Sequence, residues 1–580
     1  MSKRSGSDSP EVLPSASESD SAPTSPALSQ TIARRGFLFR AAAVGMAAVA
    51  APSLLAACEQ VVDPTPTPMG TPFPTPTPFD AGAVTGTPAV PAARQPTATP
   101  RATATATATA TPASAGASPT ATATPDPALT PSPTPAPAPR AVLATEATRV
   151  SHLLRRASFG ASKDELARFR TMGLQGTIDD LVDFDGVDDG ELEARLASQE
   201  TNIERQAHLQ LWWLQRMAYS KRPLQEKMTL FWHGILTSSF NKTGAIPAMF
   251  EQNELFRRMG MGRYDEMLKA ISRDAAMLIY LDSRTNRKAA PNENYSRELM
   301  ELFTLGVGQY TEDDVREAAR SFTGWQIKGK TEFLFNERQH DFGDKTFLDQ
   351  TGTWDGDDVV DIIMQQPAAH EYIVRRLWEF FAYADPEPTV VARLVKVFSG
   401  SQTEIRPVMR AMFESDEFYS PRAFQGLIKG PAELVASTVR SLSIDTTFVS
   451  LRRGVEAMGQ ELLDPPDVSG WDGGVTWINS STLLERVNLA NAVSNGRSQN
   501  LTFHPGSLAG ETAADSEALV DIYVDLLLGG EVADVTRTAL VEHAEYLRKP
   551  TVSSGKAVPE DERQRSVVYL ILASPDYQLA

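Results

Sequence analysis

The stretch Thr311-Glu312-Asp313-Asp314-Val315-Arg316-Glu317-Ala318-Ala319-Arg320-Ser321-Phe322-Thr323-Gly324 contains the complete signature of an amphipathic helix. It opens with Thr and three acidic residues, a pattern similar to a capping box, in which side-chain and backbone groups bond each other at a helix start. The residues that follow put four apolar side chains on one stripe and a Gly at the end: Val315, Ala318, Ala319, Phe322 and Gly324. The stretch predicts a helix that begins after Thr311 and ends by Gly324.

The same spacing recurs in distant parts of the chain. Apolar residues lie three or four positions apart in three further groups: Leu153, Leu154 and Ala157; Leu209, Trp212, Trp213 and Met217; Ile373, Leu377, Phe380 and Phe381. Sustained alternation with a period of two, which marks a half-buried strand, is hard to find. We therefore predict a mainly α fold, with one large multi-helix domain and long ordered loops over residues 142–580.

Composition excludes several classes of protein. The chain has 580 residues with 55 basic and 73 acidic side chains, a net charge of −18. This charge argues against a nucleic-acid binder, since affinity for the phosphate backbone comes from clustered Lys and Arg. Its single Cys excludes a disulfide framework, a Cys-type zinc site, an iron–sulfur cluster and attached haem. A divalent metal held by oxygen or imidazole ligands stays open.

The N-terminal region has the pattern of an export signal. Residues 1–33 are rich in Ser, Pro and Ala and are predicted to be disordered. Residues 34–57 open with Arg34 and Arg35 before Gly-Phe-Leu, which resembles a twin-arginine signal, and continue as a weakly apolar, Ala-rich run. The run ends in Leu-Ala-Ala before Cys58, which is similar to a bacterial lipobox. An uncleaved membrane anchor is the alternative, but the run is short for a span and contains Pro52.

This signal implies a lipoprotein that is attached through an acylated Cys58 to the extracytoplasmic side of a membrane. Residues 58–141 then consist mostly of Pro, Thr and Ala, with few charges and few aromatic side chains. Such a sequence cannot build a core, and its Pro-Thr repeats favour extended polyproline II. We predict a disordered tether that separates the membrane from the folded domain.

One row of polar residues could carry chemistry. Helical spacing places Asn294, Glu298 and Glu301 on one face, where their oxygen atoms could hold a hard cation or supply a general acid or base. The alternative is a solvated face braced by ion pairs, because Glu293 and Glu301 each stand four residues from Arg297.

Two histidines are further candidates. His233 follows an apolar run, whereas His340 lies in a polar loop directly before Asp341, as a potential His–Asp pair. Either ring could bind a metal or act as a base, and either could instead be a hydrogen-bonded structural residue. A turn-rich segment with two Trp, 464–479, could stack on sugars, but we expect its rings to be buried as a lid on the helix that starts near Ser481.

Taken together, these strings resemble the DUF1800 family of bacterial exported proteins of unknown function. The resemblance covers the chain from about Val150 to its end and rests on six ordered motifs: Leu153-Leu154-Arg155-Arg156-Ala157-Ser158-Phe159-Gly160, Phe231-Trp232-His233-Gly234, the run Asn294 to Gly306, Ala319-Arg320-Ser321-Phe322-Thr323-Gly324-Trp325, the run His340 to Thr346, and Pro465-Pro466-Asp467-Val468-Ser469-Gly470-Trp471.

The resemblance implies an exported helical protein, and it suggests a partner. Members are often encoded beside a second exported family that looks sulfatase-like, so a second exported protein of the same locus is a candidate partner. This chain departs from the family at two positions where relatives carry His, since it has Ile235 and Phe303 there. If those histidines are metal ligands in relatives, the departure weakens an enzymatic interpretation.

Two functions follow from these features. The first is an envelope-anchored binding or assembly protein that presents its helical domain on a long tether. The second is a metal-dependent or hydrolase-like extracytoplasmic enzyme in which the candidate side chains converge on one pocket: Glu298, Glu301, His233, His340 and Asp341. We slightly favour the first.

Overall fold

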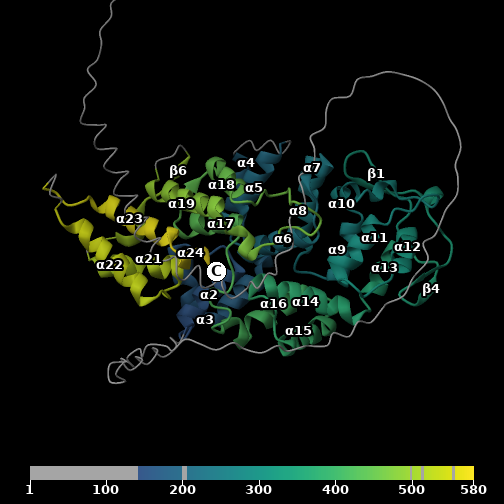
Figure 1. Cartoon of the computed structure of the whole chain (residues 1–580), viewed down its shortest axis with the longest axis horizontal. Helices are drawn as coiled ribbons and strands as arrows, with labels where there is room; N and C mark the ends of the chain where they lie inside the picture. The colour runs from purple at the N-terminus through teal and green to yellow at the C-terminus, as the bar shows by residue number, and fades with distance from the viewer. Residues whose placement is uncertain (1–141, 199–204, 497–499, 511–514, 551–554) are drawn as a thin grey trace, which may run out of the picture. The chain divides into compact units, whose positions relative to one another are not determined.

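The computed structural model describes residues 142–198, 205–496, 500–510, 515–550 and 555–580. The predicted disordered extension, signal and tether, with Arg34, Arg35 and Cys58, lie outside the described residues. Within them the chain is mainly helical, which confirms the predicted fold class (Figure 1). In this part of the chain, no helix is both long enough and apolar enough to cross a membrane.

The first half of the domain is helical up to a pair of short hairpins. Its elements are α2 (Glu146–Ala157), α3 (Lys163–Val182), η2 (Phe184–Gly186), α4 (Gly190–Ser198), α5 (Gln206–Tyr219), α6 (Pro223–Ile235), α7 (Phe240–Thr243), α8 (Ile246–Met259), α9 (Tyr264–Ser272), α10 (Ala275–Tyr280), η3 (Ser283–Thr285), α11 (Asn294–Glu298), the π-helix η4 (Leu299–Thr304), α12 (Glu312–Ser321), β1 (Trp325–Lys328), β2 (Glu332–Phe335), η5 (Glu337–Gln339), β3 (Lys345–Phe347) and β4 (Gln350–Gly352). Strand β1 pairs antiparallel with β2, and β3 with β4.

The second half is helical apart from one two-residue strand pair, β5 with β6. Its elements are α13 (Gly356–Ile363), α14 (Pro367–Phe381), α15 (Pro388–Gly400), α16 (Ile405–Phe413), η6 (Asp416–Tyr419), α17 (Pro431–Ser441), β5 (Asp445–Thr446), α18 (Val449–Ala457), η7 (Gly474–Trp477), α19 (Ser480–Asn495), β6 (Leu501–Thr502), α20 (Pro505–Ala509), α21 (Ser516–Leu528), α22 (Asp534–Arg548), α23 (Glu560–Ala573) and α24 (Pro575–Gln578).

The helix predicted after Thr311 is α12, and its start is the predicted capping box. The Thr311 side chain accepts from the backbone N–H of Asp314, and the Asp314 carboxylate accepts in return from the N–H of Thr311. Val315 and Ala318 are buried on the inner face, as their spacing indicated. Local sequence signals were sufficient here because every group involved lies within one turn of the helix start.

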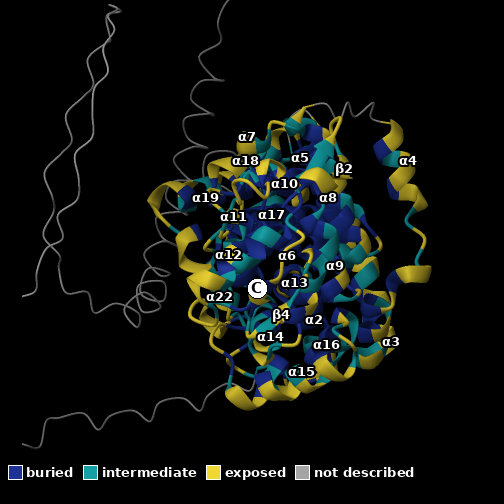
Figure 2. Cartoon of the chain, turned by 90° about the vertical axis from the view of Figure 1, so that its right-hand side faces the viewer, coloured by how far each residue is buried: buried dark blue, intermediate teal, exposed yellow. Residues whose placement is uncertain are grey.

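Two apolar clusters form the core. Core A is built mainly by α2, α3, α6, α9 and α12 to α16, and core B by α5, α17 to α19 and α21 to α23. Buried residues accordingly fill the inside of the domain and exposed residues lie around it (Figure 2). The end of α2 joins the two clusters, since Leu153 and Leu154 belong to core A and Phe159 to core B.

Buried cations reinforce this junction. Lys227 on α6 and Glu433 on α17 form an ion pair of 2.6 Å, with side chains that are 3% and 16% exposed. On α2, Arg155 donates to the carbonyls of Leu528 and Leu579 at 3.1 and 2.7 Å, which ties α2 to the end of α21 and to the C-terminus. The neighbouring Arg156 donates to the carbonyl of Ala382 at 2.9 Å, at the end of α14. These contacts connect helices that are far apart in the sequence.

We predict that Glu433→Gln is strongly destabilising. The substitution leaves the Lys227 ammonium buried without its carboxylate, and loss of one partner of a buried pair lowers the free energy of unfolding by roughly 3–5 kcal/mol. Denaturant unfolding followed by circular dichroism measures the change. Glu332→Gln is the matched control, because its ion pair with Lys328 is about two-thirds exposed and should change stability little. Equal losses in both variants would contradict the role given to Glu433.

Candidate functional site

The predicted polar row lies on a helix that changes type in its middle. After α11 the chain widens into the π-helix η4, where the backbone N–H of Leu305 donates to the carbonyl of Met300 at 2.7 Å and the Thr304 hydroxyl donates to the carbonyl of Leu299. π-Helical segments are rare and are often found at functional sites. Because this turn is wider than an α-turn, side chains beyond Glu298 no longer follow the α-helical spacing on which the row was predicted.

Glu298 and Glu301 are brought together, whereas Asn294 is not part of a ligand set with them. Both carboxylates are half-buried, and the Tyr310 hydroxyl donates to Glu301 at 2.6 Å. Burial, and then the charge of Glu301, raise the pKa of Glu298 above its usual range. Asn294 is exposed, and its backbone N–H donates to the side chain of Asn292. A carboxyl group with a raised pKa keeps its proton to higher pH, as a general acid must, so Glu298 is the candidate for this role.

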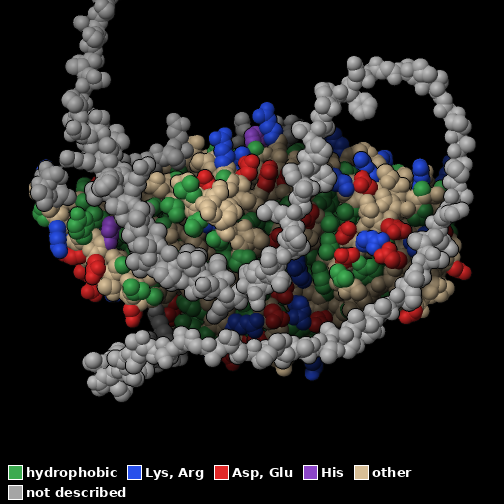
Figure 3. Space-filling view, in the orientation of Figure 1, with side chains coloured by type: hydrophobic (Ala, Val, Ile, Leu, Met, Phe, Trp, Pro, Cys, Tyr) green, Lys and Arg blue, Asp and Glu red, His purple; other side chains and the backbone are tan. Residues whose placement is uncertain are grey.

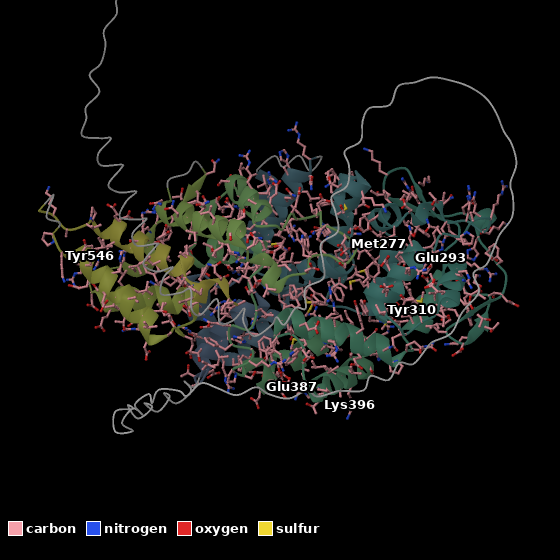
Figure 4. The ribbon with its side chains drawn as sticks, viewed as in Figure 1. Met277, Glu293, Tyr310, Glu387, Lys396 and Tyr546 are labelled. Carbon is pink, nitrogen blue, oxygen red and sulfur yellow. The ribbon has the colours of Figure 1, made fainter. Side chains whose placement is uncertain are left out.

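The alternative interpretation was a solvated face in which Arg297 forms ion pairs with both Glu293 and Glu301. The structure contains the first of these ion pairs but not the second. The Arg297 guanidinium lies 3.4 Å from Glu293 and 2.8 Å from Glu312 on α12. Glu301 is bonded to Tyr310 instead. In Figure 4, Glu293 and Tyr310 are labelled on the teal part of the ribbon, on either side of this helical segment in the sequence.

His233 is enclosed between two tryptophans. Its ring centroid lies 5.4 Å from that of Trp213 on α5 and 5.5 Å from that of Trp471. Among the described residues, neither His233 Nε2 nor Trp213 Nε1 has a hydrogen-bond partner. Burial lowers the pKa of His233 to about 3, so the ring is neutral at physiological pH. A neutral ring can accept a hydrogen bond, but it adds no positive charge.

The segment carrying Trp471 crosses the end of α6 at very short range. A Cβ atom on Gly470 would lie 2.3 Å from the carbonyl oxygen of Gly234, and Gly470 has a φ of +90°. Only glycine fits a position that combines this backbone angle with such a close approach. The expected lid is present in part, since Trp477 is buried directly before α19 and Trp471 is half-buried.

His340 and Asp341 turn to different partners. The Nδ1 atom of His340 lies 2.8 Å from the carbonyl oxygen of Thr323, and its ring is buried between Phe335 and Phe342. Asp341 accepts from Arg320 Nε at 2.7 Å, and this bond lowers the pKa of the carboxyl group. The carboxylate therefore pairs with Arg320, and the His–Asp pair that the sequence suggested is not formed between these side chains.

The structure also gathers acids that sequence reasoning did not propose as a site. Burial first, and then the charges of Asp467, Asp464 and Glu298, raise the pKa of Tyr280 to about 12. The carboxylate of Asp464 accepts from the side chains of Ser239 and Asn241, at the start of α7. The two prolines between Asp464 and Asp467 indicated a fixed turn, but not its position beside Tyr280.

Within the described ranges, no group of three or more His, Cys, Asp or Glu side chains is placed to hold a metal ion. Acidic and basic side chains lie interspersed on the face seen in Figure 3. The strongest chemical feature among the predicted residues is thus the Glu298–Glu301 pair beside Tyr310.

Comparison with known proteins identifies the family of this chain. A family model described as "Protein of unknown function (DUF1800)" matches residues 152–579. No curated protein matches the chain, and no solved structure does either.

We predict that Gly470→Ala destabilises the domain by roughly 1–3 kcal/mol, because the new methyl group meets the Gly234 carbonyl and the backbone angle is strained. Gly454→Ala is the matched control, since its added methyl group has open space on helix α18. Denaturant unfolding compares the two variants. A Gly470→Ala variant as stable as Gly454→Ala would show that this crossing is not tight.

A second prediction concerns pH. Because the pKa of Glu298 is raised, the folded protein binds the proton of this carboxyl group more tightly than the unfolded chain does. When the pH rises above 4.5, the usual pKa of a Glu side chain, ionisation of Glu298 therefore destabilises the fold. Glu298→Gln removes this penalty. We expect the melting temperature of the variant, relative to the parent, to increase between pH 4 and pH 7. The exposed Glu337→Gln variant is the reference, and a difference that does not vary with pH would contradict the prediction.

Proposed function

Because the chain belongs to the DUF1800 family, whose function is unknown, we propose that it is an exported lipoprotein whose helical domain binds a partner in the cell envelope. The export signal and Cys58 support anchoring, and the Pro/Thr/Ala-rich tether supports presentation at a distance from the membrane. A second exported protein of the same locus is the candidate partner. The exposure of Phe342 and the contacts of Asp341 support binding over catalysis.

The observation that supports the proposal most is an exposed apolar patch formed by Phe335 and Phe342, which are 39% and 62% exposed. Phe342 belongs to one of the motifs on which the resemblance rests, although it contributes little to the core. Phe335 and Phe342 lie against the ring of His340, with centroids 5.2 and 4.6 Å away. Exposed aromatic side chains that are grouped in this way are typical of protein contact sites.

The loop beneath the patch is firmly held. The Lys345 ammonium donates to the carbonyls of Asp341 and Gly343, and Asp341 is bound to Arg320. Gly324 approaches so closely that a Cβ atom there would lie 2.6 Å from the carbonyl oxygen of Asn336. A patch that is already ordered loses little conformational entropy when a partner binds.

The alternative is a metal-dependent or hydrolase-like extracytoplasmic enzyme that uses Glu298, Glu301 and His340. One observation favours it, namely the raised pKa of Glu298 beside Glu301. Two observations weigh against it. Among the described residues, no group of three or more His, Cys, Asp or Glu side chains is placed to hold a metal ion, and Asp341 pairs with Arg320 and not with His340. Binding therefore explains more of the motif residues than hydrolysis does.

The proposal predicts a specific contact at position 342 in cells. A photo-reactive amino acid in place of Phe342 in the full-length chain should give a discrete cross-linked product in the envelope fraction. The same amino acid in place of Val535, which is 64% exposed on α22, is the matched control and should give at least fivefold less product. Cross-links are detected by mass spectrometry, which identifies the partner.

Two further variants separate anchoring from binding and from catalysis. Cys58→Ser should reduce the cross-link at position 342, because release from the membrane lowers the local concentration of the domain. Glu298→Gln should leave it unchanged. Equal products at positions 342 and 535, or no product at 342 in the anchored protein, would overturn the proposed binding surface.

A further inference from the structure

A narrow cavity lies where α2, α17, α21 and α24 meet, around the C-terminus marked in Figure 1. Cationic and hydroxyl-bearing side chains contribute to its lining: Arg155, Lys429, Ser437, Ser441 and Tyr577. The cavity is partly open, and its space for water-sized atoms is about 20 Å³, which is room for one or two of the oxygen atoms of a bound group. A group of this size is a small ion or the end of a larger ligand, and a whole nucleotide or sugar does not fit.

Lys429 is the decisive residue in this lining. Its side chain is buried, with 3% of the residue exposed, and its ammonium lies 3.7 Å from the centroid of the Tyr577 ring. The carboxylate whose charge acts on this ammonium is Glu433, which is already paired with Lys227 at 2.6 Å. A buried charge without a partner is costly, which is the usual reason why such groups are paired or bind a ligand.

The surroundings of Lys429 carry an excess of positive charge. Four buried cations and the half-buried Arg155 lie in the electrostatic field of one carboxylate, Glu433, which acts to raise the pKa of each of them: Arg155, Arg156, Lys227, Lys429 and Arg486. Burial nevertheless has the larger effect. It lowers the pKa of Lys429 well below its usual value, that of Arg156 to about 9 and that of Arg486 to about 10.

Nearby carboxylates do not cancel this charge at the cavity. Asp525 lines it, but Arg170 holds this carboxylate with two bonds of 2.6 and 2.7 Å. Asp576 adds a negative charge close to Arg155. The five cations of the cluster outnumber the two carboxylates whose charges act on them, Asp576 and Glu433.

Several donors in the cluster have no acceptor. Among the described residues, Arg155 Nε, which belongs to the lining, is buried without a hydrogen-bond partner, and so are Arg486 Nε and both Nε and Nη1 of Arg156 outside the lining. Native structures leave few buried donors unpaired, so each group of them needs an explanation. Oxyanions accept several hydrogen bonds from Lys, Arg and hydroxyl groups at once.

We propose that this cavity binds one small tetrahedral oxyanion, a phosphate or sulfate group, between Lys429 and Arg155, with the hydroxyls of Ser437 and Ser441 as additional donors. The group could be a free inorganic ion or the terminal group of a larger molecule, and the cavity recognises the same chemistry in both. The site shares no residue with the apolar patch, so it stands whether or not that patch binds a protein.

Binding is tested on the full-length chain by isothermal titration calorimetry and thermal unfolding, in a chloride buffer of constant ionic strength with phosphate or sulfate added. We expect saturable binding of one ion per chain and a melting temperature that rises with its concentration. Glycerol 1-phosphate, as a soluble model of a lipid headgroup, distinguishes a terminal phosphate from the free ion. An effect of phosphate no larger than that of chloride would overturn the proposal.

Lys429→Met separates binding from a structural role, because it keeps the length of the side chain but removes its charge. If Lys429 binds an anion, the variant should bind phosphate at least tenfold more weakly while its melting temperature without phosphate stays equal or rises. If Lys429 acts only through its contact with Tyr577, the variant should melt lower and phosphate should affect neither protein. Lys221→Met, which removes an exposed cation, is the matched control and should bind as the parent does.

If Lys429→Met does not fold, the Ser441→Ala variant tests the proposed anion site instead. This smaller change removes one proposed donor from the lining and should weaken phosphate binding severalfold without lowering the melting temperature of the free protein. Unchanged affinity in a folded Ser441→Ala variant would remove Ser441 from the site and contradict the proposed position of the ion.

Discussion

One partly buried carboxylate, that of Glu433, is the constraint around which the domain is organised. It forms an ion pair with Lys227 and lies within the field of four further cations from α2, α19 and the segment before α17. Removing such charges from water is costly unless each finds partners. The two arginines of α2 find them in backbone carbonyls at the ends of other helices, including the last residues of the chain. The charges therefore require helices from both ends of the domain to meet at one point.

The motifs shared with the family mostly build the architecture. His233 fills a space between two tryptophans, Asp341 fixes a loop through Arg320, and Gly470 permits a close crossing against α6. Residues of types that can perform chemistry are thereby used in packing and hydrogen bonding. One motif residue that stays exposed is Phe342, and the apolar patch that it forms with Phe335 is what supports the proposed binding role.

The sequence predicted local features well and the candidate site only in part. The capping box at Thr311 was readable because its partners lie within one helical turn. The row of Asn294, Glu298 and Glu301 was drawn on α-helical spacing, which the π-helix interrupts, so only the two carboxylates come together. The sequence did not predict that Tyr310 and Tyr280 lie near these carboxylates. Loops bring both tyrosines close, and the spacing of apolar residues does not describe the path of a loop.

By itself, the sequence determined that the chain is mainly helical, where many of its helices begin, and which strings relate it to its family. These properties follow from spacing within one or two turns, so they can be read locally. Only the tertiary structure decided that Arg155, Lys429 and Arg486 share one buried region, and that Phe342 remains outside. Burial and electrostatic fields depend on distances in space between residues far apart in the chain, and no local pattern encodes those distances.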